Sequence, residues 1–343
     1  MGCTKGGVVL NRVKVGVVGV GSMGRHHVKS YAALKHVCDL VGIYDIDREK
    51  GEEIARAYGI TAFKSLECLL QNTHAVSVVT PTDTHYDISA QAFERGLHVL
   101  IEKPITSTVE EAQALLNLAN RRDTILQVGH IERFNPAVIE LPKILKGQKI
   151  IAAGMERMGP FNPRVVDIDV IQDLMIHDID IMRFLFPHKI KELQAFGTVA
   201  RSTNGHTDFA VANLLLEDDI IVNLTASRIT NKKVRRLTVT TMTAFIELDY
   251  LKRCITISHK GGYASLNHLS EYHQENKVER IFTADEEPLR NQLAHFISCI
   301  QSGNKPRITG ADGLEALRIS KDIQDCIRFQ TAPLTISKEV YSR

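Results

Sequence analysis

Three glycines near the N-terminus have the spacing that a bound dinucleotide requires. The motif Gly19-Val20-Gly21-Ser22-Met23-Gly24 follows the apolar run Val13–Val18 and precedes a segment of helical composition. Glycines at these places permit a tight turn, close approach of the backbone to a pyrophosphate and close helix–strand packing, while the helix N-terminus faces the phosphates. We expect dinucleotide binding here. A purely structural glycine turn and a methyltransferase loop are the alternatives.

An acidic residue indicates which dinucleotide. Asp45 ends the second apolar run about 20 residues after the motif, where a carboxylate accepts hydrogen bonds from a ribose. Asp47 adds a second acid that would repel the 2′-phosphate of NADP, whereas Arg48 would attract it. We therefore expect NAD as the cofactor, with NADP as the alternative.

Polar residues follow two further apolar runs, at the edge where open α/β sheets bind ligands. Thr80-Pro81 and then His85 come after the third run, and Glu102-Lys103-Pro104 comes after the fourth. The Lys103 ammonium can polarise a carbonyl or stabilise a developing alkoxide, and Pro104 restricts the backbone before it to extended conformations. We expect these residues at the cofactor site. A solvated loop lysine and a capping or loop histidine are the alternative interpretations.

A carboxylate and an imidazole lie one helical turn apart in Asp173-Leu-Met-Ile-His177-Asp-Ile-Asp180. At about 100° per residue, Asp173, His177 and Asp180 share one face of a helix expected over Val170–Phe186. Asp173 can accept the ring N–H and leave the other nitrogen as a general base. A solvated polar face and a metal site are the alternatives. With one histidine and no second ligand cluster, we expect no metal.

The first part of the chain alternates short apolar runs with segments of helical length, which is typical of a parallel sheet covered by helices on both faces. The expected strands are Val13–Val20, Leu40–Tyr44, Ala75–Thr80, His98–Ile101 and Ile125–Val128, and the expected helices are Arg25–Leu34, Arg48–Tyr58, Asp83–Arg95 and Val109–Asn120. We expect residues 1–130 to form a doubly wound α/β domain of the Rossmann type that binds NAD.

The remaining residues, 131–343, predict an α+β domain with a large open sheet. Several β-rich runs follow one another without helix-length inserts, so the sheet should be mainly antiparallel. These runs are Leu193–Ala200, Phe209–Leu216, Ile220–Ser227, Leu237–Thr243 and Phe245–Leu248. Besides the helix over Val170–Phe186, we expect two helices near the C-terminus, Glu287–Gln301 and Ala311–Gln330.

Composition excludes several classes of protein. The chain has 343 residues, of which 44% are hydrophobic and 24% charged, as in ordinary globular proteins rather than disordered or collagen-like chains. A formal net charge of +2 gives no field that would attract nucleic acid or an anionic membrane. Six cysteines without paired spacing suit a reducing compartment, and no apolar run approaches membrane-spanning length. We expect a cytoplasmic protein without nucleic-acid or membrane partners.

Taken together, these motifs and the following β-rich domain resemble the Gfo/Idh/MocA oxidoreductases over nearly the whole chain. The resemblance implies that the glycines and Asp45 hold the dinucleotide, that Lys103 assists proton transfer, and that Asp173 and His177 flank the substrate carbon. It also implies that the second domain binds substrate and mediates oligomerisation, as a homodimer or homotetramer. Met175 stands where the family frequently has glycine, so packing behind this helix should differ from that of the free-sugar enzymes.

Two stretches resemble one branch of that family, which oxidises nucleotide-linked N-acetyl sugars. They are Val128–Ala137, which contains Arg133 and Asn135, and Gln172–Asp180. The resemblance implies oxidation of UDP-N-acetylglucosamine at C3 to a 3-keto sugar, which a pathway aminotransferase would consume. A diphosphate needs cations, and guanidinium groups match its oxygens. The candidates are Arg133, Arg157, Arg164 and Arg228, with Arg133 and Arg157 ranked first.

Two other functions stay open from the sequence alone. A dehydrogenase or reductase of a free polyol or aldose would use the same catalytic residues and would not need the phosphate-binding arginines. A dinucleotide-binding regulator without catalysis is the second alternative, since a fold does not determine a function. The joint presence of Lys103, Asp173 and His177 argues against the regulator.

Overall fold

The computed structural model describes residues 12–161, 168–202, 204–259, 263–265, 272–274 and 277–329. These residues form two compact units, and the chain passes between them more than once. The first unit takes the described residues up to Pro136 together with Asp285–Leu317, and the second takes Ala137–Ala284 and the described residues from Arg318 onward. The sequence placed a single boundary at residue 130, so this return of the chain to the first unit was not foreseen.

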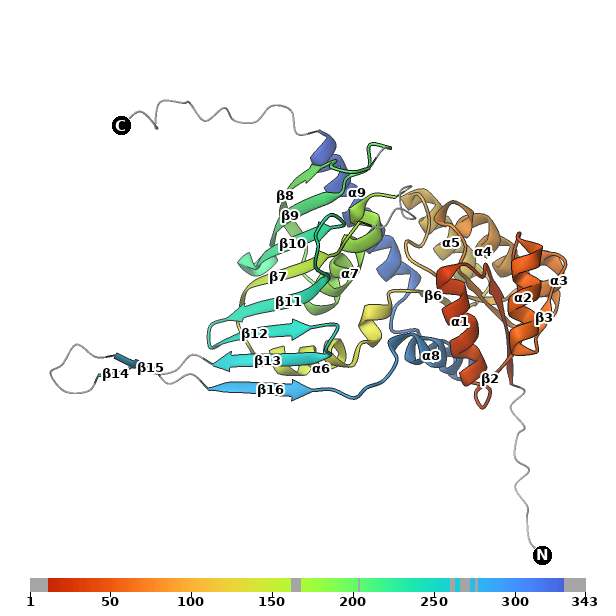
Figure 1. Cartoon of the computed structure of the whole chain (residues 1–343), viewed down its shortest axis with the longest axis horizontal. Helices are drawn as coiled ribbons and strands as arrows, with labels where there is room; N and C mark the ends of the chain where they lie inside the picture. Colours follow the sequence, from red (N-terminus) through yellow and green to blue (C-terminus); the bar gives the residue numbers. More distant parts are fainter. Residues whose placement is uncertain are drawn as a thin grey trace, which may run out of the picture. The chain divides into compact units, whose positions relative to one another are not determined.

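The first unit is built on a six-stranded parallel sheet in the order β3-β2-β1-β4-β5-β6 (Figure 1). The five expected strands are present, and β3 is an additional strand of two residues. Their bounds are β1 Val13–Val18, β2 Cys38–Tyr44, β3 Thr61–Ala62, β4 Ala75–Val78, β5 His98–Ile101 and β6 Leu126–Val128. The chain order reverses between β1 and β4, which is where doubly wound sheets bind their ligands.

Two buried clusters cover the two faces of this sheet. The helices that cover it are α1 Ser22–Ala33, α2 Arg48–Tyr58, α3 Leu66–Gln71, α4 His85–Glu94, α5 Val109–Arg121 and α8 Pro288–Ser302. Alternate residues of one strand join different clusters, as in β5, where Leu100 belongs to one and Ile101 to the other. Leu293 and Phe296 of α8 are fully buried in the cluster that also holds Val15 of β1. This apolar face of α8 is the physical reason why the chain returns to the first unit.

The second unit contains an eight-stranded sheet in the order β16-β13-β12-β11-β7-β10-β9-β8 (Figure 1). Its neighbours pair antiparallel except β7 with β10, which are parallel. The bounds are β7 Ile150–Met158, β8 Ile190–Thr198, β9 Phe209–Leu216, β10 Ile221–Ser227, β11 Val234–Thr241, β12 Ala244–Asp249, β13 Cys254–His259 and β16 Val278–Phe282. The predicted fold class, a doubly wound α/β sheet followed by an α+β unit with a mainly antiparallel sheet, is confirmed.

Helices cover one face of this second sheet. Residues alternate along β11, where Leu237 and Val239 are fully buried and Thr238 is half-buried on the opposite face. The helical elements with residues in this unit are α6 Pro136–Leu145, the π-helical turn η3 Ile171–Met175, α7 Ile176–Leu185 and α9 Gly310–Arg328. Within the part of the chain that the structure describes, no helix is long and apolar enough to cross a membrane.

The single helix expected over Val170–Phe186 is instead a π-helical turn continued by α7. A π-turn adds a residue to the helical repeat, so the angular positions expected from a regular helix do not hold across it. Asp173 and His177 stay half-exposed, whereas Asp180, expected on the same face, is 1% exposed. Short π-turns inside helices are frequent at functional sites.

Candidate functional site

The glycine motif forms the turn between β1 and α1. Gly19 has φ of +85°, and a Cβ there would approach the carbonyl oxygen of Val79 to 2.7 Å. A Cβ on Gly24 would lie 2.0 Å from the Gly19 carbonyl oxygen, so glycine permits the close packing of helix on strand. An added Cβ on Gly21 would meet no atom within 4 Å, because this part of the loop faces open space. Gly19 thus permits the tight turn, Gly21 leaves space for a pyrophosphate beside the backbone, and Gly24 permits close helix–strand packing, as the motif predicts.

The start of α1 is suited to an anion. Gly21 is its N-cap, Ser22 and Met23 open its first turn, and that turn, which is described throughout, carries no acidic side chain. Backbone N–H groups at a helix N-terminus attract phosphate. The open space at Gly21 and this helix end fit a dinucleotide pyrophosphate.

Asp45 lies at the end of β2 beside the glycine loop. Its Oδ2 accepts a hydrogen bond of 2.6 Å from the Val20 amide, and its Oδ1 accepts one of 2.9 Å from the Asp47 amide. A hollow of about 380 Å³ next to it is lined by Asp45, Ile46 and Arg48 among others. The Arg48 Nε donates to Glu52 at 2.8 Å, so that guanidinium already has a carboxylate partner. This favours NAD over NADP, because an arginine that binds a 2′-phosphate must be available to it.

His85 connects the loops that follow β4 and β5. Its Nδ1 is 2.9 Å from the carbonyl oxygen of Pro104 and its Nε2 is 2.9 Å from that of Thr80. Burial lowers the pKa of His85, although hydrogen bonds to these carbonyls and the charge of Glu102 act in the opposite direction. His85 is 1% exposed. Its two ring nitrogens join the loop at Thr80-Pro81 to the loop that contains the cis Lys103–Pro104 bond.

Glu102, which precedes Lys103, is held in a buried pair that the sequence did not predict. Its Oε1 lies 2.9 Å from Nε2 of His27, and its Oε2 accepts a 3.3 Å hydrogen bond from the Lys103 amide. Burial alone would raise the pKa of Glu102, but the hydrogen bond and charge of His27 and the charge of Lys103 hold it below its ordinary value. A Cβ on Gly129 would come within 2.9 Å of this carboxylate, so glycine there provides the space.

The sequence contains one signal for this pair. His27 lies three residues after Gly24, and it occupies the buried face of α1 together with Val28 and Tyr31. A histidine on the apolar face of a helix requires a polar partner inside the protein. The partner itself, Glu102, could not be inferred, because it lies 75 positions further along the chain.

The Asp173–His177 segment is anchored at its start by Asp169. The Oδ1 of Asp169 accepts hydrogen bonds from the amides of Ile171 at 3.0 Å and Gln172 at 2.9 Å, and its Oδ2 accepts one from Gln324 of α9. These bonds satisfy amides at the start of the helix that have no intrahelical partner. The turn that carries Asp173 and the following His177 is therefore fixed at its N-terminal end.

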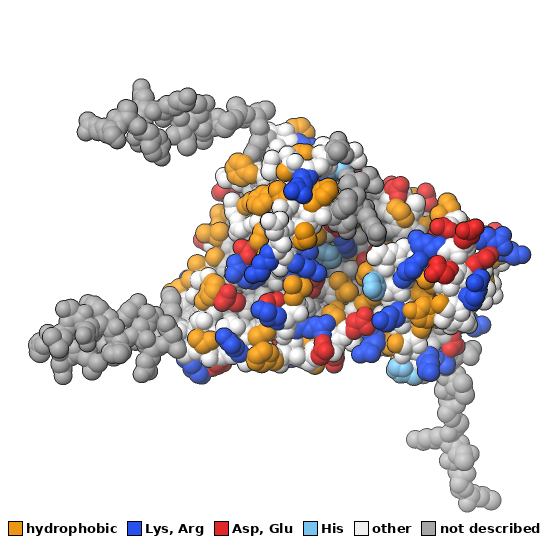
Figure 2. Space-filling view, in the orientation of Figure 1, with side chains coloured by type: hydrophobic (Ala, Val, Ile, Leu, Met, Phe, Trp, Pro, Cys, Tyr) orange, Lys and Arg blue, Asp and Glu red, His pale blue; other side chains and the backbone are white. Residues whose placement is uncertain are grey.

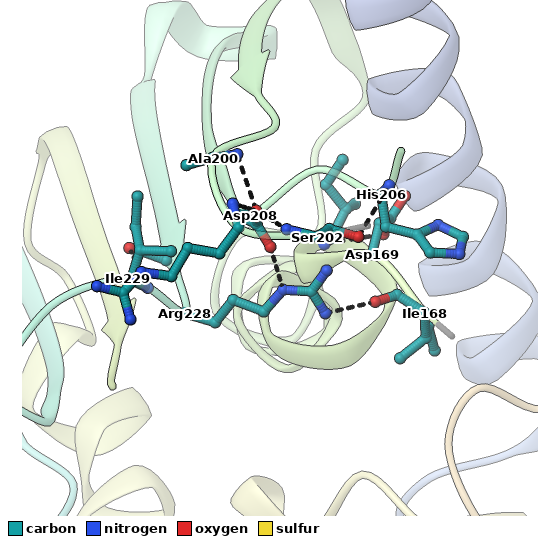
Figure 3. A network of polar contacts seen from close by, with 11 residues as sticks. Ile168, Asp169, Ala200, Ser202, His206, Asp208, Arg228 and Ile229 are labelled. Atoms are coloured by element: carbon teal, nitrogen blue, oxygen red, sulfur yellow. Dashed lines mark hydrogen bonds and ion pairs between the residues drawn. The ribbon is translucent and has the colours of Figure 1, made fainter. Parts of the chain in front are cut away.

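A second buried ion pair lies beside this anchor (Figure 3). Asp208 accepts a 2.6 Å hydrogen bond from Nε of Arg228 and further bonds from the amides of Ala200, Arg201 and Ser202. Burial would raise the pKa of Asp208, but these donors lower it far below its ordinary value. Arg228 also donates to the Ile168 carbonyl at 2.7 Å. The pair thus connects the end of β10 with the segment that leads into the π-turn.

The arginines ranked first for diphosphate binding are both buried. Arg157 is 3% exposed, its Nη2 lies 2.9 Å from Oδ1 of Asp178, and its guanidinium carbon lies 5.2 Å from the centre of the Tyr250 ring. Arg133 is 4% exposed and its Nη2 lies 3.2 Å from Oδ1 of Asp312. Each of these two guanidinium groups therefore already has a carboxylate partner.

Two other candidates for the substrate site are Asn135 and Arg164. Asn135 is 3% exposed and donates to Oε2 of Glu132 at 3.3 Å. Arg164 lies outside the described residues. Within the described residues, no group of three or more His, Cys, Asp or Glu side chains is placed to hold a metal ion.

Comparison with known proteins identifies both parts of the chain. Residues 13–130 match the oxidoreductase family with an NAD-binding Rossmann fold, and residues 161–247 match the GFO/IDH/MocA C-terminal domain. UDP-N-acetylglucosamine 3-dehydrogenase of Acidithiobacillus ferrooxidans is 38% identical over 249 residues, which is 73% of this chain and 78% of that protein. Its solved structure superimposes with a TM-score of 0.84 at 32% identity, covering 93% of this chain and 98% of that one.

More distant relatives share the same fold. The scyllo-inositol 2-dehydrogenase (NAD(+)) of Bacillus subtilis is 26% identical over 90% of this chain and 92% of that protein. Levoglucosan dehydrogenase in complex with NADH superimposes with a TM-score of 0.80 at 17% identity, covering 93% of this chain and 97% of that chain. The chain belongs to the Gfo/Idh/MocA oxidoreductase family and is an NAD-dependent dehydrogenase that acts on CH–OH groups.

Proposed function

We propose that this dehydrogenase oxidises the C3 hydroxyl of UDP-N-acetylglucosamine, or of a close relative, to a 3-keto sugar. The observation that carries the proposal is that Asp173 of the π-turn and His177 of the following helix α7 are both partly exposed, on a segment whose start is anchored by Asp169. Similarity to a UDP-N-acetylglucosamine 3-dehydrogenase supports the choice of substrate.

The residues have distinct roles in this proposal. His177 accepts the proton of the substrate hydroxyl, and Asp173 orients the imidazole for that transfer. Lys103 stabilises the negative charge that develops on the substrate oxygen. NAD, held through the glycine loop and Asp45, supplies the acceptor for the hydride. Thr80, Pro81, His85 and Glu102 shape the loops around Lys103. Arg133, Asn135 and Arg157 remain the proposed substrate-binding residues.

A second copy of the chain is the expected partner of the open sheet face. Large apolar side chains are exposed on that sheet, with Phe196 of β8 at 57%, Ile221 of β10 at 54% and Phe245 of β12 at 40%. Exposed apolar patches on an otherwise well-packed unit mark interaction surfaces. Figure 2 shows hydrophobic side chains among charged ones over the strands of this unit. We infer a homodimer or homotetramer in the cytoplasm, supplying a keto sugar to an aminotransferase.

The substrate assignment is tested by direct comparison of candidate sugars. The chain is incubated with NAD and either UDP-N-acetylglucosamine, glucose or scyllo-inositol, and products are analysed by mass spectrometry after trapping with an amine donor and an aminotransferase. We expect an amino sugar, formed by trapping of a keto product that has lost two hydrogens, only from the nucleotide sugar. Turnover of the inositol alone would replace this proposal with the polyol function of more distant relatives.

A further inference from the structure

The hollow beside Asp45 holds two carboxylates and two cations. The charged residues among its described lining are Asp45, Arg48, Glu52 and Lys64. Helix α2 comes close to β2 at this place, because an added Cβ on Gly51 would lie 3.2 Å from Cδ1 of Ile43 and 3.8 Å from Cβ of Asp45. Glu52 follows Gly51 directly, so this close approach places its carboxylate in the same hollow as the ribose acceptor Asp45.

The second acid of this hollow is not the one that the sequence indicates. The sequence predicts that Asp47 repels a 2′-phosphate, but Asp47 is the N-cap of α2, where its Oδ1 accepts a 3.1 Å hydrogen bond from the Lys50 amide. Asp47 does not line the hollow, whereas Glu52 does. Glu52 is therefore the carboxylate that shares the hollow with Asp45.

Glu52 also engages the one arginine among the described residues of this lining. Its Oε1 accepts a 2.8 Å hydrogen bond from Nε of Arg48, which lies one helical turn earlier on α2. The side chains of Arg48 and Glu52 are 74% and 45% exposed, so the pair contributes little to folding. Its main effect is local, because the carboxylate offsets the charge of the guanidinium and holds that group along the helix.

We propose that Glu52 is a specificity-determining residue that favours NAD over NADP. NADP differs from NAD by a phosphate on the ribose 2′-oxygen, the position that a carboxylate after the second strand recognises. Where NADP is bound instead, a nearby arginine accommodates that phosphate. Here Glu52 keeps Arg48 from this role, and its own charge repels the phosphate. Asp45 thus recognises the ribose of NAD, and Glu52 acts through Arg48 to exclude NADP.

The proposal implies that the chain already contains the cations that a 2′-phosphate needs. Without the charge of Glu52, the described lining would keep Arg48 and Lys64 against the single carboxylate of Asp45. Guanidinium and ammonium groups are the donors that match phosphate oxygens. Removal of Glu52 should therefore uncover an affinity for NADP. This inference concerns the cofactor alone and does not depend on which sugar is oxidised.

The experiment measures binding of NADP and of NAD to the full chain by isothermal titration calorimetry. We expect Glu52→Gln to tighten NADP binding about three- to tenfold, because the variant frees Arg48 from an exposed ion pair and removes one repelling charge. NAD affinity should change less than about twofold, since its ribose hydroxyls are neutral. The matched control Glu53→Gln removes the same charge from the adjacent residue, which does not line the hollow, and should change NADP affinity less than about twofold.

A second background separates the release of Arg48 from a general effect of charge. In Arg48→Ala, adding Glu52→Gln should tighten NADP binding less than about twofold, because no guanidinium is left to be released. Three results would overturn the assignment. They are an unchanged NADP affinity in Glu52→Gln, an equal gain in Glu53→Gln, and a gain from Glu52→Gln that is as large in the Arg48→Ala background as in the wild type.

Discussion

Replacement of His27 by leucine removes the partner of a buried carboxylate without changing the surface of the protein. His27 is 0% exposed, Glu102 is 8% exposed, and their side-chain atoms lie 2.9 Å apart. Removal of one partner from a buried, hydrogen-bonded pair costs about 3–5 kcal/mol. Because a domain has about 5–15 kcal/mol of stability in total, the variant should fold but be markedly less stable at pH 7.

The loss should depend on pH in a defined direction. In the folded wild type the pKa of Glu102 lies below its ordinary value. The ionised Glu102 carboxylate therefore stabilises the fold at pH values above its pKa in the unfolded chain. This stabilisation is lost as the pH falls through the pKa of Glu102 in the folded protein. In His27→Leu, burial acts without the histidine and favours the protonated carboxyl. The difference in unfolding free energy between wild type and variant should therefore be largest near pH 7 and decrease toward pH 4.

Urea unfolding at several pH values measures this difference, with His26→Leu as the control, because His26 is the adjacent and exposed histidine. The Lys103 amide donates to Glu102, so kcat should also fall in His27→Leu while NAD affinity is largely kept. A loss of unfolding free energy that is the same at pH 7 and pH 4, or a loss in His26→Leu as large as that in His27→Leu, would refute the reasoning.

Three further changes have defined outcomes. Asp45→Ala should weaken NAD about tenfold in a fluorescence titration and leave NADP almost unaffected, because it removes the ribose acceptor; equal losses would contradict this role. Arg157→Met should lower the free energy of unfolding in urea by about 3–5 kcal/mol. Adding Asp178→Leu should restore part of that loss, because the remaining buried charge is then gone. A double variant that is no more stable than Arg157→Met would contradict the importance of the ion pair. Phe196→Asp should shift sedimentation toward the monomer by placing a charge on the open sheet; an unchanged assembly would place the interface elsewhere.

The first unit was predictable because its signals are local. Strand β5 has the predicted bounds, helix α2 does too, and the three glycines have the packing that their spacing predicts. The two-residue strand β3 was missed because it is too short to show a period. The return of α8 to the first unit was missed because its apolar face could pack in either unit, and only tertiary contacts decide.

In the second unit, the missing information concerns partners far apart in sequence. Arg157 and Asp178 are 21 positions apart, and nothing local shows that they form a pair rather than a ligand site. The strand β7, which pairs in parallel with β10, was also missed, because Ile150–Met158 contains a glycine and two charged residues. The π-turn was not predicted because a regular helical period was assumed across it.

The central claim, that NAD oxidises the C3 hydroxyl of a nucleotide sugar with the assistance of Lys103, Asp173 and His177, is tested most directly with a substrate carrying deuterium at C3. UDP-N-acetylglucosamine labelled at that carbon is incubated with the wild type and NAD, and the reduced cofactor is analysed by mass spectrometry. The account predicts that deuterium appears in the cofactor, and that His177→Ala lowers the rate of transfer by about 10²–10⁴ while still binding NAD. Reduced cofactor without deuterium, or transfer by His177→Ala at the wild-type rate, would contradict it.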